Sequence, residues 1–202
     1  MPAKIVFASG NRGKLAEVVR LLRQYDVEVL PQSSLGIGEA LEDGSTFAEN
    51  SLIKAKHAAN ASGLPAIADD SGLAVDALDG APGVYSARYA GPEADDEQNI
   101  DKLLSALAGL RDEERGAAFH CAASYVDPAA GEPLVAEGTW RGRILVARSG
   151  SGGFGYDPVF FDPALAKGAA HLSAAEKNAV SHRGKALAAL VGAIEARYRS
   201  AT

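Results

Sequence analysis

The sequence predicts an α/β protein with a mixed β-sheet, in a single domain of two lobes. Near the start, short apolar strand patterns alternate with amphipathic helical patterns, which is typical of strands joined by helices. Farther along, residues 117–126 and 134–146 form two long strand patterns joined by a Pro/Gly turn, and we expect them to pair antiparallel. The length of 202 residues and the 47% hydrophobic composition suit one sizeable domain with its own core. We also expect a cleft between the two lobes.

The first sixty residues predict two strands and two helices. Residues 4–8 have the pattern of a short buried strand, and residues 27–30 have that of a second. Between them, one helix face repeats at i, i+3, i+4 and i+7, with Leu15, Val18, Val19 and Leu22. A loop rich in Gly and acidic residues spans 31–44. Thr46 and Glu49 then form a capping box, which opens a helix that runs to about residue 61.

The rest of the chain predicts shorter strands and further helices. Residues 66–68 form a small-residue strand that ends at Asp69-Asp70-Ser71-Gly72, and residues 73–77 form another strand. Residues 80–91 form a Gly/Pro loop. An amphipathic helix follows, with an apolar face made of Ile100, Leu103, Leu104 and Leu107. Ser181 begins the last helix, whose apolar face is Leu187, Leu190, Val191 and Ile194.

Charge and cysteine content exclude several classes of function. The formal net charge of −6 argues against a broad nucleic-acid surface, because phosphate backbones need a basic face. Cys121 is the sole cysteine, so no intrachain disulfide can form, which fits the reducing cytoplasm. No window approaches the roughly 18 apolar residues of a membrane span. We therefore expect a cytoplasmic protein with no nucleic-acid and no membrane partner.

The first candidate site lies between the first strand and the first helix. A strand end, small residues and a helix N-terminus direct unpaired N–H groups toward an anion, and a lysine adds a full charge one turn in. The segment is Ser9, Gly10, Asn11, Arg12, Gly13 and Lys14. It is not a P-loop, which needs two glycines five apart followed by Lys and Ser/Thr. A plain strand–helix turn with a solvated lysine explains the segment equally well.

The second candidate site is the acid pair Asp69-Asp70 after an apolar run. Adjacent side chains on an extended chain point to opposite faces, so the two carboxylates cannot share one role. One of them could hold Mg2+ or activate water while the other orients a lysine. The structural alternative is an Asx turn ahead of Gly72, and we favour a functional role of the acid pair over that alternative.

The acidic loop 39–43 and the helix that follows it give weaker signals. Glu49 at position N3 of the capping box is predicted to be structural. Asn50 and Lys54 are four residues apart and share a helix face, which could present an amide and an ammonium to phosphates. Taken alone, that face is better explained as a solvated surface.

Two later segments suggest a pocket for a planar base. In Gly152-Gly153-Phe154-Gly155-Tyr156-Asp157-Pro158, the glycines allow the backbone close to a ligand and the ring can stack on a base. Near the last helix stand Lys177, His182 and Arg183. Cations at a helix start oppose its dipole, so they need an acceptor, for which a keto oxygen or a phosphate would serve. A glycine hairpin and a surface turn are the structural alternatives. Glu176 forms a second capping box with Ser173 and is predicted to be structural.

Other hydrolytic sites lack their required patterns. The four histidines are not spaced as a zinc site, and Cys121 has no partner ligand near it in the sequence. Ser71 and Ser124 have no nucleophile-elbow context, which argues against a Ser-His-Asp hydrolase. Metal-assisted phosphate chemistry is the better explanation.

In this order, the five segments resemble the inosine triphosphate pyrophosphatase family, in its bacterial dITP/XTP pyrophosphatase branch. The resemblance is carried by residues 8–14, 46–50, 66–91, 154–158 and 181–184. It implies one pyrophosphatase domain over residues 1–202, a twisted mixed sheet in two lobes, and a homodimer. It further implies Mg2+-dependent hydrolysis of dITP, ITP and XTP to the monophosphate and pyrophosphate, which cleanses the nucleotide pool.

Roles for single residues follow from that resemblance. Residues Ser9 to Lys14 would hold the triphosphate, Asp70 would accept a proton and bind Mg2+, and Ser71 would touch substrate. Asp69, Glu42 and Lys54 match positions near the metal and phosphates, with Glu42 as a metal ligand. The base would be held by Phe154, Gly155, Tyr156 and Asp157, and the pocket completed by Lys177, His182 and Arg183. Ser9 stands where many members have Thr, which keeps the hydroxyl.

The expected reaction is attack of a water on the α-phosphorus, with Asp70 as the base and pyrophosphate as the leaving group. A donor such as Arg183 or His182 would select the keto group of hypoxanthine or xanthine against the amino group of adenine. Three rivals remain: a Maf-type pyrophosphatase for other nucleotides, a nucleotide sensor without hydrolysis, and an RNA-binding module. The intact acid pair argues against the sensor, and the charge of −6 argues against RNA.

Overall fold

The computed structural model describes residues 1–129 and 131–200, with the side chain of Ser200 left aside. Its contacts divide the chain into two compact units. Among the described residues, unit 1 comprises 1–70, 121–138 and 182–200, and unit 2 comprises 71–120 and 139–181. The predicted domain 1–202 includes residues 130, 201 and 202, which lie outside the described residues.

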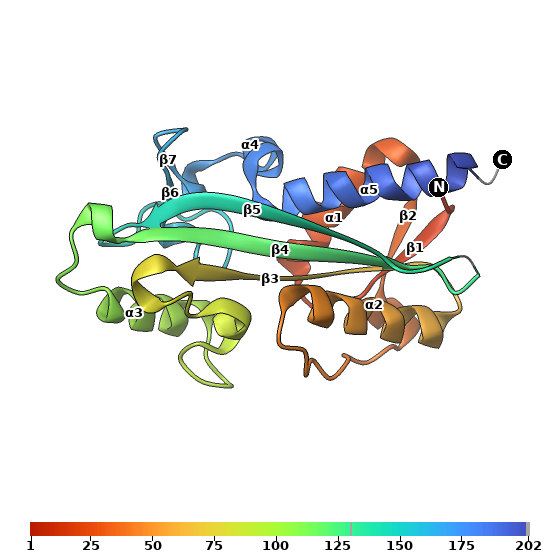
Figure 1. The fold of residues 1–202 in the computed structure, drawn as a ribbon, viewed down its shortest axis with the longest axis horizontal. Helices are drawn as coiled ribbons and strands as arrows, with labels where there is room; N and C mark the ends of the chain where they lie inside the picture. Colours follow the sequence, from red (N-terminus) through yellow and green to blue (C-terminus); the bar gives the residue numbers. More distant parts are fainter. Residues whose placement is uncertain (130, 201–202) are drawn as a thin grey trace. The chain divides into compact units, whose positions relative to one another are not determined.

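A seven-stranded sheet runs in the order β2-β1-β3-β4-β5-β6-β7 (Figure 1). β1 is parallel to both β2 and β3, whereas β6 is antiparallel to β5 and β7. The predicted α/β class and mixed sheet are therefore confirmed. The strands are β1 (Lys4–Phe7), β2 (Glu28–Pro31), β3 (Ala66–Val75), β4 (Gly116–Val126), β5 (Leu134–Ile144), β6 (Phe160–Asp162) and β7 (Lys167–Gly168).

Five α-helices and seven 3-10 turns accompany these strands in the described residues. The α-helices are α1 (Arg12–Leu22), α2 (Phe47–Ser62), α3 (Asp96–Ala106), α4 (Ala174–Val180) and α5 (His182–Ser200). The 3-10 turns are η1 (Arg23–Tyr25), η2 (Gln32–Leu35), η3 (Asp76–Leu78), η4 (Gly83–Arg88), η5 (Asp112–Glu114), η6 (Asp157–Val159) and η7 (Ala169–His171). In the described part of the chain, no helix is long and apolar enough to cross a membrane.

Unit 1 packs helices on both faces of its strands. The predicted apolar face of the last helix, α5, is buried against β1, β3, β4 and α1, with Leu187, Leu190 and Ile194 fully buried. A second cluster of small residues joins α2 to the opposite face, where Ala55 and Ala58 meet Ala68. Because these side chains are small, α2 lies close to the strands. Its polar residues Asn50 and Lys54 therefore reach Asp70, the last residue of β3 that belongs to unit 1.

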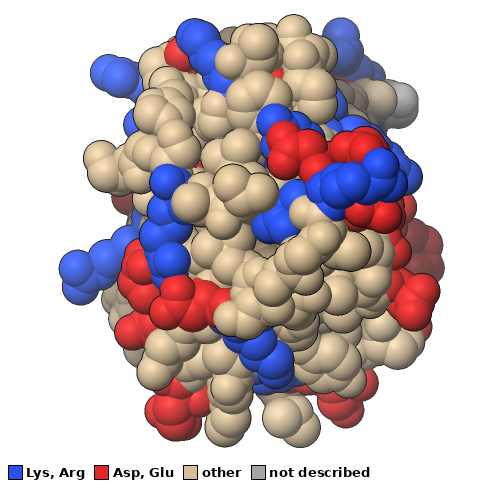
Figure 2. Space-filling view, turned by 90° about the vertical axis from the view of Figure 1, so that its left-hand side faces the viewer, with Lys and Arg blue, Asp and Glu red and all other residues tan. Residues whose placement is uncertain are grey.

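Unit 2 has its own apolar core. The predicted helix face is confirmed, since Ile100 and Leu103 of α3 are buried in it. Three aromatic rings form its centre, with ring centroids 4.6–6.0 Å apart: Phe119, Trp140 and Phe160. Over the face shown in Figure 2, basic and acidic side chains are interspersed among uncharged ones. Each unit therefore has an apolar centre of its own.

The capping boxes predicted at Thr46–Glu49 and Ser173–Glu176 are both present. The predicted strand break at residues 69–72 is wrong, because β3 continues through it from Ala66 to Val75. The acid pair does not stand at a strand end. Polar residues disfavour strand interiors, but both carboxylates find cationic partners here, and tertiary contacts override the local preference.

Two smaller differences come from unit 2. The predicted Gly/Pro loop at 80–91 contains the 3-10 turn η4, in which the Ser86 hydroxyl donates to the Gly83 carbonyl at 2.6 Å. The short strands β6 and β7 have no counterpart in the sequence prediction, because runs of three and two residues carry no readable period. The predicted cleft between lobes stays a prediction.

Candidate active site

The predicted phosphate segment forms the turn between β1 and α1. Asn11 is the N-cap of α1, and its side chain accepts the backbone N–H of Lys14 at 3.0 Å. The Ser9 hydroxyl accepts the N–H of Asn11 at 3.1 Å, which fixes the turn before the helix. Gly10, Asn11 and Arg12 are exposed. The arrangement presents a helix N-terminus to solvent, where it favours an anion.

Asp69 is fully buried and lies between two cations. Its Oδ2 is 3.1 Å from Lys14 Nζ and accepts from Arg183 Nε at 3.0 Å. Burial alone would raise the pKa of the Asp69 carboxyl, but the charges of Lys14 and Arg183 outweigh it and hold the pKa well below its usual value. Asp69 is thus ionised and pairs with Lys14. Orienting a lysine is the role predicted for one of the two acids.

Arg183 has a second carboxylate partner that the sequence did not indicate. Its Nη1 donates to Glu17 of α1, and both side chains are buried. Glu17 lies beside the apolar stripe of α1, three residues after Lys14, so only its position next to that stripe could have drawn attention to it. The acceptors that Arg183 requires at a helix start are therefore protein carboxylates.

Asp70 has a different set of partners, on α2. Its Oδ1 accepts from Lys54 Nζ at 3.1 Å and its Oδ2 from Asn50 Nδ2 at 3.3 Å. Because Asp69 and Asp70 contact different elements, the expectation that they point to opposite faces is confirmed. Burial raises the pKa of the Asp70 carboxyl, Lys54 and Lys14 oppose that rise, and Glu42 adds to it. Asp70 is thus the more basic of the two acids.

Lys54 links Asp70 to the acidic loop that leads into α2. Its ammonium also donates to Glu42 Oε2 at 2.9 Å, and its side chain is only 12% exposed. Burial alone would lower the pKa of Lys54, but Asp70, Asp69 and Glu42 raise it, so the group stays charged. Asn50 is 4% exposed and its amide oxygen accepts the N–H of Gly44 at 2.9 Å. The solvated-surface explanation of Asn50 and Lys54 is therefore wrong.

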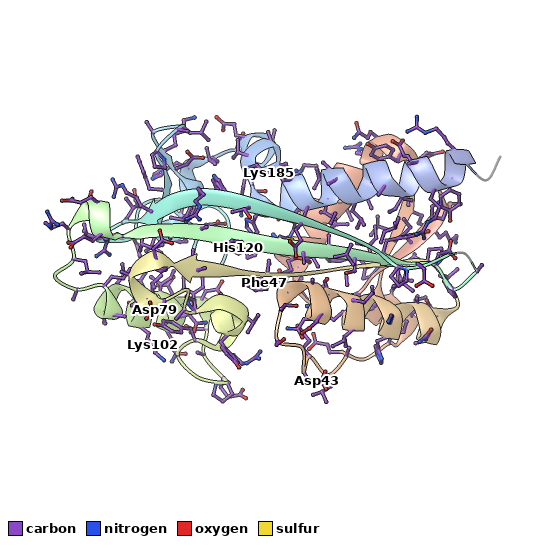
Figure 3. All side chains as sticks on the ribbon, viewed as in Figure 1. Asp43, Phe47, Asp79, Lys102, His120 and Lys185 are labelled. Carbon is purple, nitrogen blue, oxygen red and sulfur yellow. The ribbon has the colours of Figure 1, made fainter. Side chains whose placement is uncertain are left out.

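The acidic loop also approaches the phosphate segment. A Cβ added to Gly10 would lie 2.5 Å from Glu39 Oε1, so glycine is what lets this carboxylate lie against the turn. Farther along, from Asp43 to Phe47, the chain enters α2 (Figure 3). There Glu49 accepts three contacts from Ser45 and Thr46, which confirms its structural part in the capping box.

In unit 2, the glycine-rich loop carries the residues predicted to hold a base. Asp157 is 2% exposed, and its Oδ2 accepts the N–H of Phe154 at 2.9 Å and the ammonium of Lys177 at 2.5 Å. That ammonium lies 4.6 Å from the centre of the Phe154 ring. The Tyr156 hydroxyl donates to the Ser86 carbonyl at 2.9 Å. The loop thus presents a half-buried ring beside a buried ion pair, a combination that suits a planar polar ligand.

The predicted site residues fall into the two units. Unit 1 brings together the phosphate segment, Glu42, Lys54, both acids and Arg183, with His182 buried at the first turn of α5. Unit 2 contains Ser71, directly after Asp70 in β3, and residues 154–157 with Lys177. We call them the charge cluster (Lys14, Glu17, Glu42, Lys54, Asp69, Asp70 and Arg183) and the ring cluster (Phe154, Tyr156, Asp157 and Lys177).

The donor set of the charge cluster suits a hard divalent cation. Glu42 and Asp70 both contact Lys54 Nζ, so the two carboxylates lie around one ammonium. Among the described residues, no group of three or more His, Cys, Asp or Glu side chains could hold a metal by itself. Two carboxylates with the remaining ligands from water and phosphate is the coordination that Mg2+ commonly has in phosphate-transferring sites. The carboxylates present therefore fit a hard divalent cation.

Sequence comparison assigns the family. The model of the Ham1 family matches residues 5–193. The chain belongs to the Ham1 family. It is 55% identical to the dITP/XTP pyrophosphatase of Pectobacterium atrosepticum over 195 residues, which cover 95% of this chain and 98% of that one. It is also 55% identical to the dITP/XTP pyrophosphatase of Halorhodospira halophila, over 96% of this chain and 98% of the relative.

Solved structures of Ham1 proteins share the fold of this family member. A HAM1 protein from Coxiella burnetii superposes with a TM-score of 0.86 at 46% identity, covering 96% of this chain and 99% of that one. The nucleoside-triphosphatase or dITP/XTP pyrophosphatase of Mycobacterium abscessus gives a TM-score of 0.72 at 47% identity, with 93% and 97% covered. At 46% and 47% sequence identity, the similarity to these two structures supports the family assignment as well as the fold.

Proposed function

We propose that the protein hydrolyses non-standard purine nucleoside triphosphates, namely dITP, ITP and XTP, to the nucleoside monophosphate and pyrophosphate, and so cleanses the nucleotide pool. The observation that carries the proposal is the division between the two acids. Asp69 is held as a buried anion by Lys14 and Arg183, whereas Asp70 keeps a raised pKa beside Lys54. In this proposal Asp69 is the fixed structural anion and Asp70, next to it in the chain, is the proton acceptor.

The triphosphate is bound by cations and backbone amides of unit 1. Lys14 Nζ and Lys54 Nζ each lie near carboxylates that neutralise them in the absence of substrate. The N–H groups at the start of α1 add donors that carry no charge. The charge on the leaving pyrophosphate is the main electrostatic demand of the reaction, and these groups are arranged to meet it.

Asp70 accepts the proton of the water that attacks the α-phosphorus. Its two oxygens are oriented by Lys54 and Asn50, so the carboxylate is held in one position before substrate arrives. Asp70 and Glu42 would hold Mg2+, which would supply Lewis-acid activation and charge neutralisation. We therefore expect chelation with EDTA to abolish hydrolysis and added Mg2+ to restore it.

The base is held by the ring cluster. The Phe154 ring offers a stacking surface, and the Lys177 ammonium beside it has donor hydrogens for a keto oxygen. Adenine has an amino donor at that position, so two donors would face one another, and a site built for hydrogen bonding rejects such a mismatch by up to about 10⁴-fold.

Arg183 has a different part in this proposal from the one predicted. Its Nε and Nη1 donate to Asp69 and Glu17, so we propose that it acts by fixing Asp69. Direct contact of His182 or Arg183 with the base stays a prediction. We also propose one catalytic domain over the whole chain, a homodimer and a cytoplasmic location; analytical ultracentrifugation tests the dimer.

A panel of ITP, XTP, dITP, ATP, GTP and dTTP with Mg2+ tests the proposed function. Pyrophosphate and orthophosphate are measured separately. We expect rapid pyrophosphate release from ITP, XTP and dITP, and at least about a hundredfold lower kcat/KM for ATP. Fast turnover of dTTP would instead support a Maf-type pyrophosphatase, and tight binding without turnover would support a nucleotide sensor.

A further inference from the structure

The glycine-rich loop of unit 2 is tied to α3 at two points. Near its start, Arg148 pairs with Glu97 at 2.8 Å and with Asp101 at 2.7 Å. Near its end, the backbone N–H of Gly155 donates to Asp96 Oδ2 at 2.7 Å. Asp96, Glu97 and Asp101 all belong to α3, so one helix contacts both ends of the loop that carries the ring cluster.

The carboxylate of Asp96 does not cap the N-terminus of α3. The N-cap of α3 is Asp95, whose side chain accepts the N–H of Gln98 at 2.8 Å and completes a capping box with it. Asp96 is the first residue of the helix and its side chain is bonded instead to a peptide 59 residues away. Two consecutive aspartates thus divide two tasks, one within the helix and one on the loop.

The peptide that Asp96 binds is at the centre of the ring cluster. Gly155 lies between Phe154 and Tyr156, and its φ of +58° is in the left-handed region that favours glycine. On one side Asp157 accepts the N–H of Phe154, and on the other the Tyr156 hydroxyl donates to Ser86. Asp96 fixes the peptide between them, and with it the direction in which the Phe154 ring leaves the backbone.

We propose that Asp96 is a positioning residue for base recognition: its carboxylate, by accepting the Gly155 N–H, holds the Phe154 ring beside Lys177 in the orientation that stacks on a purine. The proposal rests on the proposed function. A charge-assisted bond to a backbone N–H is stronger than a neutral one, and a glycine at positive φ is otherwise free to reorient. Asp96 bonds to the peptide that joins Phe154 to Gly155, and its charge also acts on Tyr156, the next residue of the loop.

Three variants separate positioning from stability. Asp96→Ala removes the acceptor, whereas Asp96→Asn keeps an amide oxygen that can accept the same N–H. Asp95→Ala is the matched control, because it removes the N-cap of the same helix and leaves the contact between Asp96 and Gly155. For each, we would measure KM and kcat for ITP and the inhibition constant of inorganic tripolyphosphate, which has phosphates and no base.

We expect only the binding of the purine base to change. Asp96→Ala raises KM for ITP about five- to tenfold, with kcat and tripolyphosphate inhibition within about twofold of the parent. Asp96→Asn restores most of the affinity, and Asp95→Ala lowers the melting temperature without moving KM. Arg148→Met, which releases the other end of the loop, raises KM for ITP in the same direction.

Each other outcome overturns the inference. If Asp96→Ala equals the parent, or if Asp95→Ala raises KM as much, then Asp96 acts only on the stability of α3. If Asp96→Ala weakens tripolyphosphate as much as ITP, then Asp96 does not act on the base. If the parent hydrolyses none of the purine triphosphates, the proposed function itself is wrong, and the assay of the parent alone identifies that case.

Discussion

The charge cluster of unit 1 and the ring cluster of unit 2 are held together in opposite ways. In the charge cluster, Arg183 meets Asp69 and Glu17 across sequence separations of 114 and 166 residues. In the ring cluster, Asp157 bonds to Phe154 three residues away and to Lys177 twenty residues away. The Arg183 pairs of the charge cluster form only once distant elements have packed, whereas the Asp157 pairs of the ring cluster join one loop to the helix after it. Within each cluster a minority of contacts differ, since Tyr156 bonds to Ser86, 70 residues away, and Lys54 bonds to Glu42, 12 residues away.

This difference has consequences for stability and for chemistry. Buried charges that depend on distant partners become costly when one partner is removed, because the remaining ions cannot be solvated. A loop that is held by several local hydrogen bonds can lose one of them and keep its backbone conformation. The charge cluster should therefore tolerate fewer substitutions than the ring cluster, while substitutions in the ring cluster should act mainly on the choice of substrate.

The largest expected effect concerns Asp70, the proposed proton acceptor. Asp70→Asn keeps the size of the side chain and removes its basicity, so kcat should fall by about 10³-fold. Because Asp70 is partly exposed, the melting temperature should stay within a few degrees of the parent by thermal unfolding. Asp43→Asn, the same change on the exposed acidic loop, is the control and should leave kcat unaltered. A near-normal rate for Asp70→Asn would rule out its proposed part in the reaction.

The next effect separates the two clusters by stability. Arg183→Met leaves Asp69 and Glu17 buried together without their shared cation, and should cost about 3–5 kcal/mol of unfolding free energy. Urea denaturation followed by fluorescence measures it. Arg20→Met, on the exposed face of α1, should change stability by less than about 0.5 kcal/mol. A loss below 1 kcal/mol for Arg183→Met would mean that the charge cluster is not a stability element.

A smaller loss is expected in the ring cluster. Lys177→Met removes a cation from Asp157, which still accepts the Phe154 N–H, so we expect about 2 kcal/mol. The same variant should raise KM for ITP about tenfold and leave tripolyphosphate inhibition unchanged. Lys167→Met, which breaks an exposed ion pair with Glu176, is the control and should cost less than about 1 kcal/mol. If Lys177→Met were as destabilising as Arg183→Met, the contrast between the clusters would fail.

The smallest effect belongs to neither cluster. Thr46→Ala removes the N-cap side chain of α2 and should cost about 1 kcal/mol. We expect kcat for ITP to be unchanged, because the Asn50 side chain is also held by the Gly44 N–H and Lys54 lies one turn farther along the helix. Ser105→Ala, on the exposed surface of α3, is the matched control and should be nearly neutral. A fall in kcat for Thr46→Ala would show that the charge cluster depends on the end of α2 as well as on its side chains.

Sequence reasoning predicted what local rules determine. The capping boxes at Thr46 and Ser173 and the apolar face of α5 follow from spacing alone, and all three are present. The continuity of β3 through Asp69 and Asp70 was missed, because it depends on cations from α1, α2 and α5 that no local pattern reveals. Local preference for a break yielded to those long-range ion pairs.

The site residues divide along the same line. The glycine-rich loop and the acid pair stood out as sequence motifs, but their partners did not. Glu17 is one acid among many on an amphipathic helix, and Asp96 is the second of two aspartates at a helix start. Only the fold shows that each contacts a residue far along the chain. Asn50 and Lys54 were undervalued for the same reason, since burial cannot be deduced from a shared helix face.

Hydrolysis of ITP in oxygen-18-labelled water tests the central claim most directly. If water attacks the α-phosphorus, the label enters the inosine monophosphate and the pyrophosphate stays unlabelled. Mass spectrometry of both products after one turnover measures the distribution. Label in the pyrophosphate, or labelled orthophosphate as the main product, would contradict the account, because attack would then occur at the β- or γ-phosphorus.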